Sequence, residues 1–220
     1  MVRGGRVERE EDTTFDAYGQ EPGPNLNPAL VPGSGVPGSC ICVIGTSGAG
    51  KTYVAEALSR RLGLRYVCDD TLVWRANWQP VPREERLLAF DAATREPGWV
   101  CDGNLGASVE DRLLLERCDT IVWLDLPRRE VHWQVLVRTI RRALTREPLW
   151  HGNVESWRIF FSRDSIVWWS IKTYPSRKQT YAALFADPAL ADRTRIRLRS
   201  KREVDAWLAS LSERQAQADS

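Results

Sequence analysis

The chain has 220 residues, 43% of them hydrophobic, and a net charge of +2, which suits one α/β domain with a sizeable core. No apolar run approaches the roughly 20 residues of a membrane span, and the N-terminus lacks a signal-peptide pattern, so we expect no membrane partner. The five cysteines form no C-x-x-C pair, which favours a reduced, cytoplasmic protein without structural zinc.

The first 39 residues are rich in glycine, proline and acidic side chains and have few periodic hydrophobic residues. Such a segment buries too little apolar surface to fold by itself, so residues 1–39 are predicted to be a disordered tail. A tail that docks on the domain or on a partner is the alternative.

The apolar run 40–44 predicts a strand, and the residues after it match the pattern G-x-x-x-x-G-K-[ST]. In this pattern the glycines let backbone N–H groups surround an anion, the lysine reaches the β- and γ-phosphates, and the hydroxyl binds Mg²⁺. The stretch therefore predicts a nucleotide phosphate site made of Gly45, Thr46, Ser47, Gly48, Ala49, Gly50, Lys51 and Thr52.

Helical and strand patterns alternate through the rest of the chain, which predicts a parallel sheet covered by helices. Further strands are expected at 64–68, 99–101, 120–126 and 195–198. Helices are expected at 50–62, 83–95, 109–117, 130–145 and 153–171, with a closing helix that ends at Leu211. The folded domain is thus predicted to span 40–211, and 212–220 to be a flexible C-terminus.

Acidic residues follow several of these strands. Asp69 and Asp70 come after the second predicted strand, Asp102 ends the third, and Asp125 lies in the fourth. Because ligands of parallel sheets bind beyond the carboxyl ends of the strands, these acids are expected near the phosphate site.

Residues 128–178 form a basic block, with eleven basic and four acidic side chains. Arg138 and Arg142 lie one turn apart on the helix expected there, and Gln134 lies one turn before them. This block suggests a region that closes over phosphates, whereas a solvated basic face is the alternative. Interleaved aromatic residues could stack nucleic-acid bases, although helices that pack through aromatic faces are favoured.

Five motifs, at 45–52, 70–74, 99–104, 122–127 and 150–153, stand in the order found in adenylate-kinase-related P-loop proteins. Many bacterial members of that family carry the label "topology modulation protein". The resemblance covers roughly 40–211 and implies a nucleoside-monophosphate-kinase fold of the α/β class: a five-stranded parallel sheet sandwiched by helices. It also implies an acceptor-binding segment after the second strand, a helical lid over 128–178, ATP and Mg²⁺.

The chain departs from the resembling family at three positions. Gln134 and Val154 stand where arginine is common, and Val73 stands where histidine is common. These departures remove cations near the expected phosphates, so the resemblance does not fix the chemistry of the lid.

The hypothesis for the site is phosphoryl transfer, which depends mostly on positioning and charge neutralisation. Lys51 and the 45–52 backbone would hold ATP, and Thr52 would bind Mg²⁺. Asp102, at the end of the strand expected beside the first strand, would hold a water on that metal. Asp125 is the alternative, but in the resembling kinases its position leads into the lid.

Three further residues receive roles in this hypothesis. Asp70 would meet the acceptor hydroxyl as general base or orienter, and an exposed loop acid is the alternative. Arg138 and Arg142 would neutralise the transferring phosphoryl group, and a solvated helix face is the alternative.

The predicted activity is therefore transfer of the γ-phosphoryl group of ATP to a nucleotide or another small hydroxylated or phosphorylated acceptor. A nucleic-acid-associated ATP-binding regulator and an NTP hydrolase without acceptor are the alternatives. No helix-turn-helix signature stands out and the overall charge is mild, so a nucleic-acid partner is not favoured.

Overall fold

The computed structural model describes residues 37–105, 108–154 and 165–218. In chain order its elements are β1 (Cys40–Gly45), α1 (Lys51–Leu62), β2 (Arg65–Cys68), α2 (Asp69–Val73), η1 (Ala76–Trp78), α3 (Arg83–Thr94), β3 (Trp99–Gly103), α4 (Val109–Arg117), β4 (Thr120–Leu124), α5 (Arg128–Thr145), η2 (Trp150–Gly152), α7 (Ile166–Ala186), η3 (Pro188–Leu190), β5 (Thr194–Leu198) and α8 (Lys201–Ala218).

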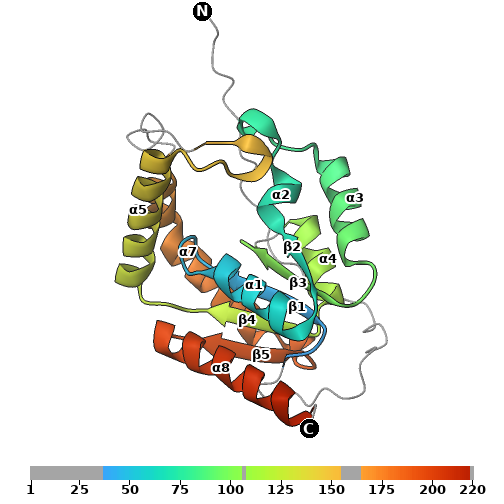
Figure 1. The fold of residues 1–220 in the computed structure, drawn as a ribbon. Helices are drawn as coiled ribbons and strands as arrows, with labels where there is room; N and C mark the ends of the chain where they lie inside the picture. Colours follow the sequence, from blue (N-terminus) through green and yellow to red (C-terminus); the bar gives the residue numbers. More distant parts are fainter. Residues whose placement is uncertain (1–36, 106–107, 155–164, 219–220) are drawn as a thin grey trace, which may run out of the picture.

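The five strands form one parallel sheet in the order β2-β3-β1-β4-β5. This confirms the predicted five-stranded sheet, and it places the end of β3 beside the end of β1, with Val43 opposite Asp102. Helices cover both faces of the sheet (Figure 1). Because the strands are parallel, their carboxyl ends meet at one edge of the sheet. The acids that follow the predicted strands were expected at this edge.

Alternating side chains of β1 build the two halves of the core. Ile41 and Val43 face the side covered by α1 and α8, whereas Cys42 and Ile44 face the side covered by α3, α4 and α7. All four side chains are almost completely buried, as a central strand between two helical layers requires.

The residues just before β1 are attached to the sheet. The backbone N–H groups of Ser39 and Cys40 donate to Asp119 Oδ2, over 2.9 and 3.0 Å, and Gly38 N donates to Thr120 Oγ1 over 2.8 Å. The ordered domain thus includes 37–39, which the sequence had assigned to the tail. Residues 1–36, on which the rest of the tail prediction falls, lie outside the described residues.

The predicted helix 153–171 is wrong at its first two residues. Asn153 has extended backbone angles, and Val154 forms an antiparallel bridge with Pro148. Residues 155–164, which include Trp157, Phe160 and Phe161, lie outside the described part of the chain. Helix α7 begins only at Ile166.

Helix α7 also continues much further than expected. Pro175 lacks an N–H group and usually kinks or ends a helix, yet α7 runs through it to Ala186. Helix α7 contributes the buried side chains of Tyr174, Tyr181 and Leu184 to the core. Their contact with the rest of the domain stabilises the second half of the helix. The last helix, α8, likewise continues beyond Leu211 to Ala218.

Within the described ranges, no helix is both long and apolar enough to cross a membrane. All five cysteines have free thiols.

Candidate active site

The loop between β1 and α1 has the backbone that an anion site requires. Gly48 and Gly50 both have φ of +89°, a left-handed conformation that glycine adopts at little cost. Gly50 is the N-cap of α1, and no side chain in the described residues caps this end of the helix. The first turn of α1 also contains no acidic residue, so its N–H groups and its positive end are suited to bind an anion.

Helices α5 and α7 pack directly on this loop. Val131 and Val135 of α5 are completely buried, and a Cβ on Gly48 would lie 2.3 Å from Val135 Cγ2 and 2.8 Å from Val131 O. From α7, Ser170 Oγ donates to Ser47 O over 3.4 Å. Both ends of the predicted 128–178 lid are therefore packed on the phosphate loop, and movement of the segment between them stays a prediction.

This packing predicts different costs for two glycine substitutions. Gly48→Ala places a Cβ against a backbone oxygen and adds left-handed strain, so we expect about 3 kcal/mol of destabilisation. Gly50→Ala meets no atom within 4 Å and carries only the strain, about 1 kcal/mol. Thermal unfolding should show a fall of about 6 to 12 °C for Gly48→Ala and about 2 to 4 °C for Gly50→Ala. Equal falls would contradict the close contact with α5.

Lys51 lies at the centre of the site. Its Nζ donates to Gly45 O over 3.0 Å, to Thr46 O over 3.3 Å and to Asn104 Oδ1 over 2.9 Å. Burial lowers the pKa of Lys51 to about 8, although the carboxylates of Asp102 and Asp70 oppose this shift. The ammonium group is therefore charged at neutral pH and begins to lose its proton only slightly above it.

The lowered pKa of Lys51 predicts proton uptake when a nucleotide binds. Phosphate oxygens favour the charged ammonium group and raise its pKa, so at about pH 8.5 ATP should bind together with up to about one proton. At about pH 6.5 Lys51 is already protonated and contributes no uptake. Titration calorimetry in buffers of different ionisation enthalpy measures the difference, and the titration at about pH 6.5 is the control. The absence of uptake at the higher pH would contradict the assignment.

Thr52 and Asp102 form the pair that fits a metal. Thr52 Oγ1 donates to Asp102 Oδ2 over 2.6 Å, and Asp102 is only 6% exposed. Asp102 Oδ1 is buried and has no hydrogen-bond partner among the described residues. A buried carboxylate oxygen is costly without a partner, and a hydrated Mg²⁺ would supply one. The described residues contain no group of three or more His, Cys, Asp or Glu side chains that could hold a metal, so such an ion would depend on water and phosphate oxygens.

Asp125, the alternative metal residue, has other partners. Its Oδ1 lies 3.0 Å from Lys178 Nζ, and its Oδ2 accepts from Arg197 Nε over 3.0 Å and from Arg197 Nη2 over 2.6 Å. The guanidinium group of Arg197 also stacks over Trp123 at 4.2 Å. Asp125 thus joins β4 to α7 and β5 through ion pairs, so the geometry favours Asp102.

The charges of the other residues predicted for catalysis act on the carboxyl group of Asp70. Burial raises the pKa of Asp70 above its usual value, while Lys51, Arg138 and Arg142 pull it back down. Asp102 is close enough to add to the increase. The charges of Lys51, Asp102, Arg138 and Arg142 therefore all act on Asp70, although α1, α2, β3 and α5 supply these five residues separately.

The sequence prediction did not assign a role to Asn104. Its side-chain oxygen accepts from Lys51, its N–H donates to Asp69 Oδ2 over 3.4 Å, and its carbonyl accepts from Arg177 Nη1 over 2.6 Å. Burial raises the pKa of Asp69 to about 7, and the nearby Asp70 adds to this shift. Asn104 directly follows Asp102-Gly103 at the end of β3, and this position could have marked it as a site residue in the sequence.

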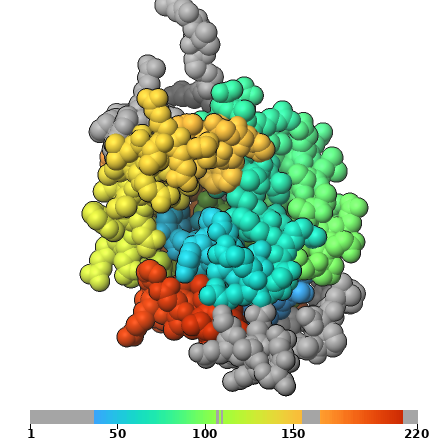
Figure 2. Space-filling model, in the orientation of Figure 1, coloured from blue at the N-terminus to red at the C-terminus, as the bar shows by residue number. Residues whose placement is uncertain are grey.

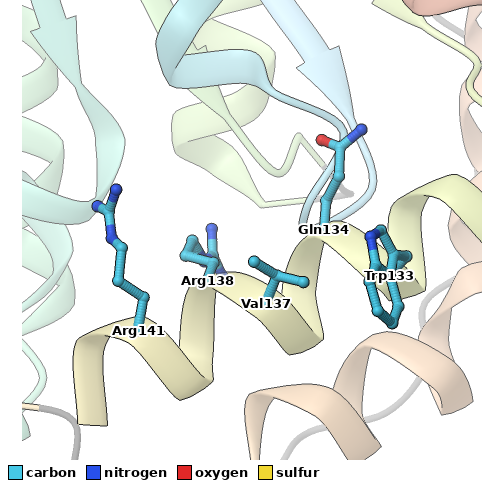
Figure 3. A pocket seen from close by; sticks show the side chains of 5 residues that line it. All are labelled: Trp133, Gln134, Val137, Arg138 and Arg141. Carbon is cyan, nitrogen blue, oxygen red and sulfur yellow. The ribbon is translucent and has the colours of Figure 1, made fainter. Parts of the chain in front are cut away.

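Helix α5 also lines an open pocket of about 300 Å³. Figure 3 shows Gln134, Arg138 and Arg141 extending from the same side of α5, whereas Trp133 extends to the other side. Arg138 lines this pocket, and its charge also acts on Asp70. The space-filling view shows the blue phosphate-loop region at the bottom of a hollow beside α5 (Figure 2).

The fold and the loop define the class of this protein. Parallel strands in the order β2-β3-β1-β4-β5, with a glycine-rich loop between β1 and α1 at their carboxyl ends, form a P-loop NTPase fold of the nucleoside-monophosphate-kinase type.

Several solved structures are similar to this chain. A gluconokinase from Sinorhizobium meliloti 1021 has 18% sequence identity and a TM-score of 0.44, and the match covers 84% of this chain and 98% of that chain. A shikimate kinase from Bacteroides thetaiotaomicron has 15% identity, a TM-score of 0.47 and coverages of 80% and 97%. A shikimate kinase from Acinetobacter baumannii, in complex with shikimate, has 17% identity, a TM-score of 0.47 and coverages of 81% and 94%.

Neither a family model nor a curated protein sequence matches the chain. Membership in the adenylate-kinase-related family of topology modulation proteins therefore stays a prediction.

Proposed function

We propose that this protein is an ATP-dependent kinase that transfers the γ-phosphoryl group of ATP to a small hydroxylated or phosphorylated acceptor. One observation carries the proposal: Lys51 Nζ lies 3.0 Å from Gly45 O and 3.3 Å from Thr46 O in the phosphate loop, and its charge, together with those of Arg138 and Arg142, acts on Asp70. A carboxylate among three cations is suited to meet an acceptor hydroxyl where the negative charge of a transferring phosphoryl group is neutralised.

The residues would divide the work as follows. The 45–52 backbone and Lys51 would hold the phosphates, and Arg138 and Arg142 would stabilise the charge that develops on the transferring group. Mg²⁺, when bound, would neutralise oxygens of the β- and γ-phosphates. Thr52 would be its ligand, and Asp102 would orient a water in its shell.

Asp70 would orient the acceptor and receive its proton. Because burial raises its pKa, Asp70 is a better base than an ordinary aspartate, yet its neighbouring cations keep it ionised more easily than burial alone would allow. The raised pKa thus supports the role of general base.

A screen for acceptors tests the proposal. Nucleosides, nucleoside monophosphates, sugars and other small hydroxylated metabolites are added to protein, ATP and Mg²⁺, and ADP release is measured. We expect at least one compound class to stimulate ADP release and to gain a phosphoryl group detected by mass spectrometry. ADP release that no compound stimulates would instead favour an NTP hydrolase.

Arginine substitutions separate a kinase from a nucleic-acid-binding regulator. Arg138→Ala and Arg142→Ala should each lower turnover about 100-fold and change ATP affinity by less than about threefold, because their charge is needed most in the transition state. Arg129→Ala, an exposed change on the same helix, should leave both values unchanged. Tight DNA binding at physiological salt that both site variants weaken, without any loss of turnover, would favour the regulator.

A further inference from the structure

Two short loops meet beside the predicted acceptor segment. One is closed by an antiparallel bridge between Trp74 and Pro80, and the other by a bridge between Pro148 and Val154. The turns η1 and η2 lie inside these loops and contact each other, at the top of the molecule in Figure 1. The first loop follows α2 and the second follows α5, so together they join the two sides of the site.

Asn153 makes the central contacts between the loops. It is only 3% exposed, and its Oδ1 accepts from Trp78 N over 2.9 Å. Its Nδ2 donates to Arg75 O over 2.9 Å and to Trp150 O over 2.8 Å. The amide therefore uses both of its donors and its acceptor, and two of the three bonds cross from one loop to the other.

Other side chains support the same junction. A ring nitrogen of His151 lies 3.0 Å from Thr71 O, on helix α2 itself. The ring of Trp78 packs edge to face against Trp74 at 6.0 Å and against Trp150 at 6.4 Å. The loop after α5 thus holds the chain both at α2 and beyond it.

Helix α2 needs such external support. It has only five residues, each of them partly buried, and so short a helix is not stable alone. On the sheet side, Asp69 Oδ2 accepts from Asn104 N. On the other side, a ring nitrogen of His151 lies against Thr71 O, and Asn153 holds Arg75, two positions beyond the end of the helix. Asp70 belongs to this helix, so its position depends on both sets of contacts.

We propose that Asn153 is a positioning residue that couples the loop after α5 to the acceptor segment and thereby fixes Asp70. The catalytic part of this inference rests on the proposed function, whereas the coupling of the loops does not.

Hydrogen exchange of the ligand-free protein tests the coupling. Asn153→Ala removes all three bonds, and Asn153→Asp keeps the shape but removes both donors. We expect both variants to exchange amide hydrogens at least about tenfold faster in 71–81 as well as in 149–154, with the sheet unchanged. Thr145→Ala is the control, because its hydroxyl donates within α5, to Arg141 O. Faster exchange confined to 149–154 would overturn the coupling.

A double-mutant cycle tests the catalytic part. Asn153→Asp alone should lower acceptor phosphorylation at least about tenfold and raise the ratio of ATP hydrolysed to acceptor phosphorylated. In an Asp70→Asn background the same change should have little further effect, because Asn153 acts through Asp70. Additive losses would overturn this role. If no acceptor is ever found, the proposed function fails, and the exchange result alone decides the coupling.

Discussion

Replacing Lys51 by methionine is expected to lower ATP turnover at least about 100- to 1,000-fold, the range seen when one donor to a developing anion is removed. Lys51 Nζ is held by Gly45 O, Thr46 O and Asn104 Oδ1, so it already lies against the loop that would surround the phosphates. Methionine keeps most of the length of the side chain and removes the charge. Turnover is measured as ADP release with and without acceptor.

The fold of the Lys51→Met protein should survive. Burial has lowered the pKa of Lys51 to about 8, so its charge is a cost in the ligand-free protein, and an apolar side chain of similar volume is often tolerated at such a position. We expect its unfolding temperature to stay close to that of the wild type, but the increase that ATP causes in the wild type should be lost. A folded variant with unchanged ATP affinity and turnover would refute the phosphate site.

The sheet and the phosphate loop could be predicted because their signals are local. Short segments of three to seven residues, with apolar runs or alternating apolar residues, marked the strands, and Gly63 ended α1 in a left-handed conformation at the expected place. The resemblance to kinases of this fold predicted that β1 and β3 lie side by side, and the pairing of Val43 with Asp102 confirms this.

The parts that could not be predicted depend on distant contacts. Asp102 and Asp125 both follow apolar runs, and only the partners of Asp125 on α7 and β5 separate them. Asn153 was predicted inside a helix, but its side chain bonds to Trp78 and Arg75, more than 70 positions earlier in the chain. Local propensity contains no information about such partners.

The second large effect is expected for Asp70→Asn, which should lower acceptor phosphorylation about 100- to 10,000-fold, the usual contribution of a general base. ATP affinity should stay unchanged or increase slightly, because the substitution removes a negative charge near Lys51 and the arginines. Acceptor phosphorylation and ATP binding are measured separately.

The activity of the wild-type protein should also depend on pH through the protonation of Asp70. Asp70 has to be ionised to accept a proton, and burial raises its pKa, so wild-type activity should fall on acidification at a higher pH than an ordinary aspartate would give. Residual activity of Asp70→Asn should lack this acidic limb. An unchanged limb would mean that another group is the base.

Asp69→Asn is the matched control for Asp70→Asn, since the two residues are adjacent on α2. Asp69 Oδ2 accepts from Asn104 N, a bond that the oxygen of an asparagine side chain can still accept, so its loss of activity should be much smaller. Burial raises the pKa of Asp69 to about 7, so near neutral pH it is already partly protonated and resembles the amide. A greater loss for Asp69→Asn than for Asp70→Asn would transfer the role of general base to Asp69.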